Sequence, residues 1–279
     1  MLGNGFSIRD AIGFGWHKSL EHFYLLMKVV LAIFVLEMVL LIGFVPLIFF
    51  LNITQNSYLS FIPVTLLCAY LVTSTLLIIS VIRLGILRVL LDIYERNSSE
   101  VTRLFSCSNL VFTYLCALIL LSLIMLPVVT FFAVLGMILP PAVVGIIGLI
   151  ASIGMIFVQT RFAFYVYPIV DVKMGAIDAL KRSWRITQGS VLRLIIFEII
   201  LGLIPAALGI VVILNILVTI MLVSNGWSLA AVVPIALVLI ALFFLALLVP
   251  VIFLANVYAY KKLVEHTSNN HRFNTLHRE

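Results

Sequence analysis

The chain is short of charged residues and of cysteine. Only 10% of its 279 residues are charged, whereas roughly a quarter are charged in an ordinary soluble domain. This deficit excludes an ordinary soluble fold. The three cysteines, Cys68, Cys107 and Cys116, form no CxxC pair. They indicate neither a disulfide framework nor a cysteine metal site, and are typical of small core residues.

Signatures of catalysis are also missing. The sequence contains no HExxH, no GxSxG, no Walker phosphate loop and no GxGxxG that opens a helix. The five histidines lie near the two ends, and the spacings of His266, His271 and His277 match no compact zinc pattern. We therefore expect no enzymatic activity, no metal and no cofactor.

Apolar residues, in contrast, make up 64% of the chain. About 20 helical residues cross a hydrocarbon core of roughly 30 Å. Six apolar runs reach this length: 24–51, 58–82, 110–138, 140–168, 191–223 and 229–259. The sequence therefore predicts an all-α, polytopic membrane protein with six transmembrane helices.

Basic residues are distributed unequally between the two ends of these spans. The connections 52–57, 137–140 and 224–228 contain no charged residue, and all 17 Lys and Arg lie in or beside the N-terminus, 83–109, 161–193 and the C-terminal tail. Because basic residues near span ends stay in the cytoplasm, both termini are predicted to be cytoplasmic. The net charge of +6 then suits anionic headgroups on that side better than nucleic acid.

Proline and arginine positions indicate an internal repeat. Three pairs of residues share a separation of 78 positions: Pro63 with Pro141, Pro127 with Pro205, and Arg83 with Arg161. Such a period is typical of duplicated structure, and units that begin on the same membrane side are parallel repeats. We predict three such units in a membrane domain over 1–260, at about 6–96, 98–174 and 175–260, and a flexible cytoplasmic tail over 261–279.

Each unit is predicted to be an amphipathic interface helix followed by a two-helix hairpin. The segments "SIRDAIGFGWHKS" (7–19) and "AIDALKRSWRITQ" (176–188) are similar, with Ala11 opposite Ala179 and Trp16 opposite Trp184. The middle copy, near 98–109, has no tryptophan and one arginine, and is the least secure of the three.

In the segment 176–188, Ile177, Leu180 and Trp184 share one helical face and the charged residues occupy the other. A helix of this kind lies in the headgroup plane. Gly189 predicts a left-handed C-cap at its end. The residues predicted to contact lipid or a partner are Trp16, Lys18, Lys181, Arg182, Trp184 and Arg185.

A second candidate site consists of polar residues inside the spans or at their inner ends: Glu37, Glu198, Arg83 and Arg161. An ionised acid at a helix centre costs roughly 2.5–3.5 kcal/mol, so such residues are candidates for function. Purely structural roles for these residues stay open: a protonated glutamate hydrogen-bonded between helices, a local ion pair of Glu198 with Arg193, or an arginine that reaches lipid phosphates.

Small residues predict where two of the helices pack. The fourth span carries Gly145, Gly148, Ala151 and Gly154, and the fifth carries Gly202, Ala206 and Gly209. Rows of small residues let two backbones approach each other. We therefore expect these two helices to pack closely.

Between Tyr167 and Ile200 the chain resembles uncharacterised bacterial inner-membrane proteins of the YciC-like type, and the membrane domain attached to some glycerophosphodiester phosphodiesterases. The matching positions are Pro168, Asp171, Lys173, Gly175, Ala179, Ser183, Thr187 and Gly189. The resemblance implies a multi-pass protein of the bacterial cytoplasmic membrane and no established activity. The sequence contains no soluble phosphodiesterase domain, so we expect none of that chemistry.

The leading functional hypothesis is a non-enzymatic membrane protein that contacts anionic lipid or a partner through its interface helices, in membrane organisation or scaffolding. A protein partner or a second copy of the chain is left open. The alternative is a small transporter or channel that uses Glu37, Glu198 and proline-broken helices. An intramembrane enzyme ranks third, because no nucleophile, base or metal constellation is present.

Overall fold

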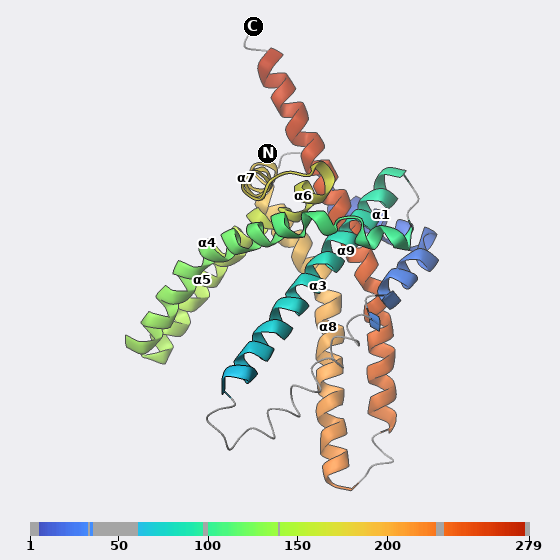
Figure 1. The fold of residues 1–279 in the computed structure, drawn as a ribbon, viewed down its shortest axis with the longest axis vertical. Coiled ribbons are helices and arrows are strands. Elements are labelled where there is room, and N and C mark those ends of the chain that lie inside the picture. Colours follow the sequence, from blue (N-terminus) through green and yellow to red (C-terminus); the bar gives the residue numbers. More distant parts are fainter. Residues whose placement is uncertain are drawn as a thin grey trace. The chain divides into compact units, whose positions relative to one another are not determined.

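The described part of the chain is helical. The computed structural model describes residues 6–32, 34–35, 61–96, 100–138, 140–226 and 232–276. Within these ranges there is no strand, and the helices (Figure 1) are α1 (Ile8–Glu21), the segment Phe23–Ala32, α3 (Phe61–Arg96), the 3₁₀ turns η2 (Val101–Phe105) and η3 (Ser108–Leu110), α4 (Val111–Ile138), α5 (Pro141–Phe162), α6 (Val166–Val172), α7 (Ala176–Ile186), α8 (Val191–Ser224) and α9 (Val232–Leu276).

Four helical stretches are long and apolar enough to cross a membrane. They are Val101–Ile138, Val143–Val172, Val191–Ser224 and Val232–Ser268. They match the last four predicted spans, so an all-α protein with several membrane-spanning helices is confirmed in this coarser form. The first predicted span lies mostly outside the described residues. The second falls on the beginning of α3, and the count of six spans stays a prediction.

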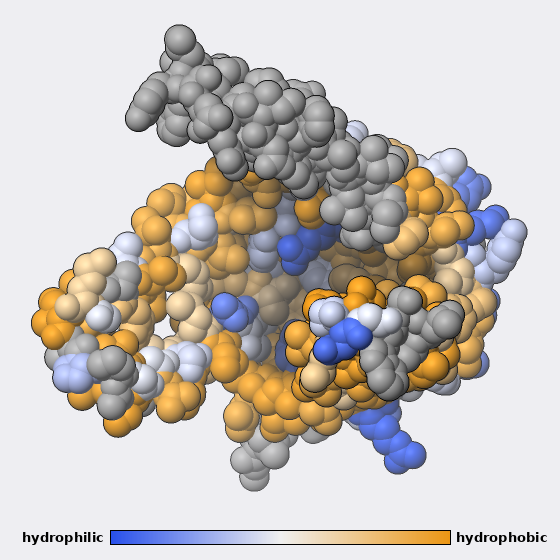
Figure 2. Space-filling model, turned by 90° about the horizontal axis from the view of Figure 1, so that it is seen from below, coloured by the Kyte–Doolittle hydropathy of each residue, from blue (hydrophilic) through white to orange (hydrophobic). Residues whose placement is uncertain are grey.

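The surface of these helices is apolar, as a membrane requires. Large hydrophobic side chains are exposed along α4, α5, α8 and α9. Apolar residues cover most of the coloured surface in Figure 2. In water this exposure would be strongly unfavourable, because each Å² of apolar surface left hydrated costs about 25 cal/mol of free energy. In hydrocarbon it carries no such cost.

The chain separates into two compact units. One consists of Met1–His22, Val128–Phe164 and Lys181–Glu279, and the other of Phe23–Pro127 and Tyr165–Leu180. Their boundaries differ from the three predicted sequence repeats because contacts join segments that are distant in sequence. Each unit is described separately below.

In the first unit, α1 lies against α9, and α8 packs on both α9 and α5 (Figure 1). The hydroxyl of Ser7 caps α1 by accepting a hydrogen bond from the backbone N–H of Asp10 at 3.4 Å. The face of α1 that packs is made of small residues, Ala11, Gly15 and Ser19, which are all buried. A Cβ at Gly15 would lie 2.5 Å from the carbonyl oxygen of Val251. Only glycine permits this crossing without a shift of the backbone.

In the second unit, α3 contacts η2, η3 and α6. Its inner surface buries Leu84, Leu90 and Ile93. Gly85 meets the backbone of Leu104 in η2 so closely that a Cβ there would clash with the Leu104 carbonyl group. Both units therefore depend on one glycine where an interface segment meets a long helix.

The predicted glycine contact between spans four and five is wrong in its residues. Helices α5 and α8 do pack on each other, but a Cβ at Gly145, Gly148, Gly154, Gly202 or Gly209 would meet nothing within 4 Å. A row of small residues allows close approach but does not enforce it, since the helices gain as much from packing elsewhere. Among the described residues, the close contacts that need glycine are at Gly15 and Gly85.

The segment predicted as a flexible tail is helical as far as Leu276. Helix α9 runs unbroken through Pro250 for 45 residues, about 68 Å at 1.5 Å per residue, which is more than twice a hydrocarbon core of ~30 Å. Beyond the apolar stretch, Leu263 is buried and Lys262 pairs with Glu265 at 2.8 Å. The helix thus continues past the predicted boundary at Lys261.

We predict that Gly15→Leu lowers the stability of the protein by about 1–3 kcal/mol, as overpacking typically does. The new side chain has to displace the backbone of α9 at Val251. Gly13→Leu is the matched control, because nothing lies within 4 Å of a Cβ at Gly13 on the same helix. Thermal unfolding in detergent micelles measures both; equal midpoints for the two variants would contradict the proposed packing.

Candidate functional site

Helix α7 is attached to the end of α5 through side-chain hydroxyls. The last carbonyl groups of a helix have no partner within it. The hydroxyl of Ser183 donates to the carbonyl oxygen of Arg161 at 2.9 Å, and the hydroxyl of Thr187 lies 3.4 Å from the same oxygen. Both hydroxyl residues are fully buried. Helix α7 therefore caps the C-terminal end of α5.

The side chain of Arg161 lies among aromatic rings. Its guanidinium carbon is 5.2 Å from the ring centre of Phe157 and 4.8 Å from that of Trp184. Nη1 donates to the carbonyl oxygen of Trp184 at 3.4 Å, and Nε is buried without a hydrogen-bond partner. Cation–π contacts of this kind contribute about 0.5–2 kcal/mol each. The sequence placed Arg161 and Trp184 in two different candidate sites, and the structure brings them together.

One side of the Trp184 ring packs on the protein and the other side is exposed. Its ring packs on Phe162 with 5.5 Å between the ring centres, yet 43% of the residue is exposed. An indole in this setting is typical of the boundary between lipid and water, because it offers an apolar body and a polar N–H.

The outer face of α7 combines apolar and basic side chains. Ile177, Lys181, Trp184 and Arg185 are exposed, and Arg182 is half-buried. Leu180 was predicted to share the lipid face, but it is only 7% exposed and faces the protein. The sequence analysis did not weigh a second face of this helix, made of small residues: Ala179, Ser183 and Thr187 are all buried, and the hydroxyls of Ser183 and Thr187 dock on the Arg161 carbonyl at the end of α5.

Helix α1 shows the same arrangement. Trp16 and Leu20 are exposed, while its small-residue face is buried. Lys18 pairs with Glu21 at 2.7 Å, which offsets its charge. The signal was present in the sequence as small residues at every fourth position of both segments: Ala11, Gly15 and Ser19, then Ala179, Ser183 and Thr187.

Arg83 lies 78 positions before Arg161 but has a different environment. In the second unit its Nη1 donates to the hydroxyl of Tyr114 at 3.1 Å. The Tyr114 ring is in turn stacked on Tyr165, with 6.2 Å between centres. The two arginines are equivalent in sequence and not in contacts.

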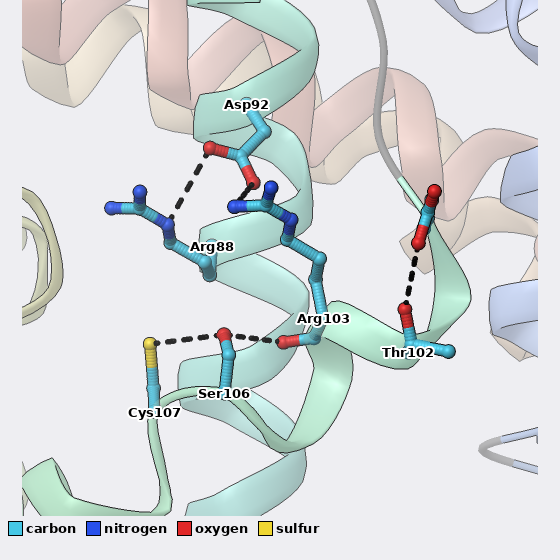
Figure 3. A network of polar contacts seen from close by, with 7 residues as sticks. Arg88, Asp92, Thr102, Arg103, Ser106 and Cys107 are labelled. Atoms are coloured by element: carbon cyan, nitrogen blue, oxygen red, sulfur yellow. Dashed lines mark hydrogen bonds and ion pairs between the residues drawn. The ribbon is translucent and has the colours of Figure 1, made fainter.

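The middle interface segment is attached by charge. Asp92 of α3 is 2% exposed. Its carboxylate lies 3.4 Å from Nε of Arg88 and 3.4 Å from Nη1 of Arg103 in η2 (Figure 3). Ion pairs with two arginines compensate a carboxylate that has no closer hydrogen bond. This segment forms 3₁₀ turns rather than an amphipathic α-helix.

The intramembrane site predicted around Glu37 and Glu198 stays a prediction, because only Glu198 lies within the described residues. Glu198 is exposed on α8. The guanidinium of Arg193 donates to the carbonyl oxygen of Phe6 at 3.1 Å, and no ion pair joins it to Glu198 in the described part of the chain. Glu37 lies outside the described residues. Among the described residues there is also no group of three or more His, Cys, Asp or Glu that could hold a metal ion.

Comparison of the chain with protein-family models, with curated proteins and with solved structures finds no match. The roles of these residues therefore rest on their geometry and chemistry alone.

We predict that the double variant Ser183→Ala with Thr187→Ala destabilises the fold by about 1–3 kcal/mol, because the buried carbonyl of Arg161 loses its donors. Ser190→Ala is the control, since the Ser190 side chain forms no capping hydrogen bond. Unfolding midpoints measured in the same detergent test this. A double variant as stable as the control would show that the hydroxyls do not hold α7 in place.

We also predict that Asp92→Asn destabilises the protein by about 1–3 kcal/mol, because two arginines lose their shared counter-ion. Glu100→Gln removes the same charge from an exposed residue nearby and is expected to change stability little. Limited proteolysis of the segment 97–110 gives a second readout. Faster cleavage is expected only in the Asp92 variant.

Proposed function

We propose that this chain is a non-enzymatic multi-pass membrane protein whose interface helices contact anionic lipid headgroups, with a role in membrane organisation. The observation that carries the proposal is the exposed face of α7, where Ile177 and Trp184 alternate with Lys181 and Arg185. The opposite face of α7 is attached to α5 by the hydrogen bond from the Ser183 hydroxyl to the Arg161 carbonyl.

The chemistry of this face fits a headgroup layer. Apolar and aromatic side chains insert at the boundary of the acyl chains, while basic residues on the same helix reach phosphates. Each basic residue near an anionic membrane surface contributes about 1 kcal/mol. Trp16 and Leu20 on α1 offer the apolar part of such a contact, and paired Lys18 contributes less charge than expected.

The order of the elements supports three repeated units. The second interface segment precedes α4 and α5, and the third, α7, precedes α8 and α9. Each segment also packs on the last helix of another proposed unit: α1 on α9, η2 on α3, and α7 on α5 through Ser183. The same kind of contact thus occurs three times with different chemistry, which is expected of diverged copies.

The positive residues favour an orientation with both termini in the cytoplasm, and the resemblance described above favours a bacterial cytoplasmic membrane. The partner that best fits the exposed face of α7 is therefore an anionic phospholipid of the inner leaflet.

A transporter would need its glutamates in a shared polar site. Glu198 instead lies exposed on α8 and Glu37 is not described, so no observation favours that alternative.

The double variant Lys181→Gln with Arg185→Gln is expected to reduce the enrichment of anionic lipid around the protein several-fold, since each residue contributes about 1 kcal/mol. The measurement is the lipid composition of polymer-bounded discs extracted from vesicles of phosphatidylethanolamine and phosphatidylglycerol. Unchanged enrichment would overturn the proposal.

A matched control removes two charges elsewhere. Lys261→Gln with Lys262→Gln changes the net charge equally, but Lys262 is already paired with Glu265. We expect a smaller change in enrichment for this variant and a loss of salt dependence only in the α7 variant.

A further inference from the structure

Arg161 is a cation without a counter-ion in the described structure. Arg88 and Arg103 share the carboxylate of Asp92, whereas no carboxylate among the described residues pairs with Arg161. Its contacts are the two aromatic rings, one long hydrogen bond to the Trp184 carbonyl and a buried Nε without a partner. A guanidinium has five N–H donors, so most of its hydrogen-bonding capacity is unused.

The position of this cation is fixed by the fold. Its own carbonyl accepts the hydrogen bond from Ser183, and its guanidinium carbon lies within 5.2 Å of two ring centres. Little side-chain freedom therefore remains to be lost on binding an anion. Because Nε is buried, the available donors are those of the two Nη atoms.

The surroundings indicate which anion. Arg161 lies in the last turn of α5, at the end of an apolar stretch suited to hydrocarbon and next to the exposed ring of Trp184. At this boundary the abundant anion is the phosphate of a membrane lipid. A planar guanidinium matches phosphate oxygens with two parallel hydrogen bonds.

We propose that Arg161 and Trp184 form a binding site for the phosphodiester group of a single glycerophospholipid. This inference rests on the proposed function and names the ligand of one site within it. The Nη atoms of Arg161 donate to the phosphate oxygens, and the indole of Trp184 covers the glycerol backbone. Since zwitterionic and anionic lipids share the phosphodiester, this site does not select by headgroup charge. Selection by charge belongs to Lys181 and Arg185.

The full-length protein is extracted from vesicles of phosphatidylethanolamine and phosphatidylglycerol into mild detergent. Native mass spectrometry then counts the phospholipids that remain bound to it. The wild type is expected to retain one lipid of either class. In Arg161→Gln its occupancy is expected to fall about tenfold, and Arg161→Lys is expected to recover little, because an ammonium lacks the planar pair of donors. Retention unchanged in Arg161→Gln would overturn the proposal.

Arg185→Gln is the matched control, because it removes the same charge from the residue after Trp184. It is expected to keep the retained lipid while it lowers anionic enrichment in the discs. The two proposals therefore fail separately. If Arg161→Gln loses the retained lipid but Lys181→Gln with Arg185→Gln leaves the enrichment unchanged, the Arg161 site is supported and the proposed function is overturned. If Arg161→Gln keeps the retained lipid but Lys181→Gln with Arg185→Gln lowers the enrichment, only the Arg161 site is overturned.

A wild-type titration covers the case in which Arg161→Gln does not fold. Delipidated protein is titrated with short-chain phosphatidylglycerol, short-chain phosphatidylcholine and inorganic phosphate, and tryptophan fluorescence is followed. Saturable changes with both lipids and none with inorganic phosphate are expected. A response to inorganic phosphate that competes with the lipids would assign the site to a soluble phosphate, and a response to phosphatidylglycerol alone would show selection by headgroup charge; either overturns the assignment.

Discussion

The structure depends on close contact between short interface segments and the ends of long apolar helices. Hydrophobic attraction does not hold helices together inside a bilayer, because lipid chains solvate them equally well. What remains is backbone approach, hydrogen bonding and ion pairing. The described residues use all three, for example at Gly15 against Val251, at Ser183 on the carbonyl of Arg161, and at Asp92 between two arginines.

Docking decides which face of each interface helix is presented outward. Both α1 and α7 bury a row of small residues and expose a tryptophan on a neighbouring face. Each helix also leaves apolar side chains exposed, Trp16 and Leu20 on α1 and Ile177 and Trp184 on α7, although Leu180 of α7 is buried. In α7 the basic residues Lys181 and Arg185 are also exposed. Attachment to α5 and the proposed contact with lipid therefore use separate faces of α7.

Local features were largely predictable from the sequence. The helical nature, the last four membrane spans and the left-handed glycine at Gly189, with φ of 83°, follow from composition, run length and the absence of a Cβ. Helix ends were less predictable. Lys173 also has a left-handed backbone, with φ of 54°, although it is not a glycine and the sequence did not predict it. Helix α9 continues to Leu276, past the boundary predicted at Lys261. Leu263 beyond this boundary is buried, and burial depends on neighbours that are distant in the sequence.

The sequence by itself determined that the chain is apolar, helical and basic at one set of connections, since these are properties of single residues and their spacing. Only the tertiary structure decided which glycines matter, that Leu180 faces inward, and that Arg161 meets Trp184 across a separation of 23 positions. The physical reason is that small residues, hydroxyls and arginines each fit several environments. Their role is set by the partner that the fold places beside them.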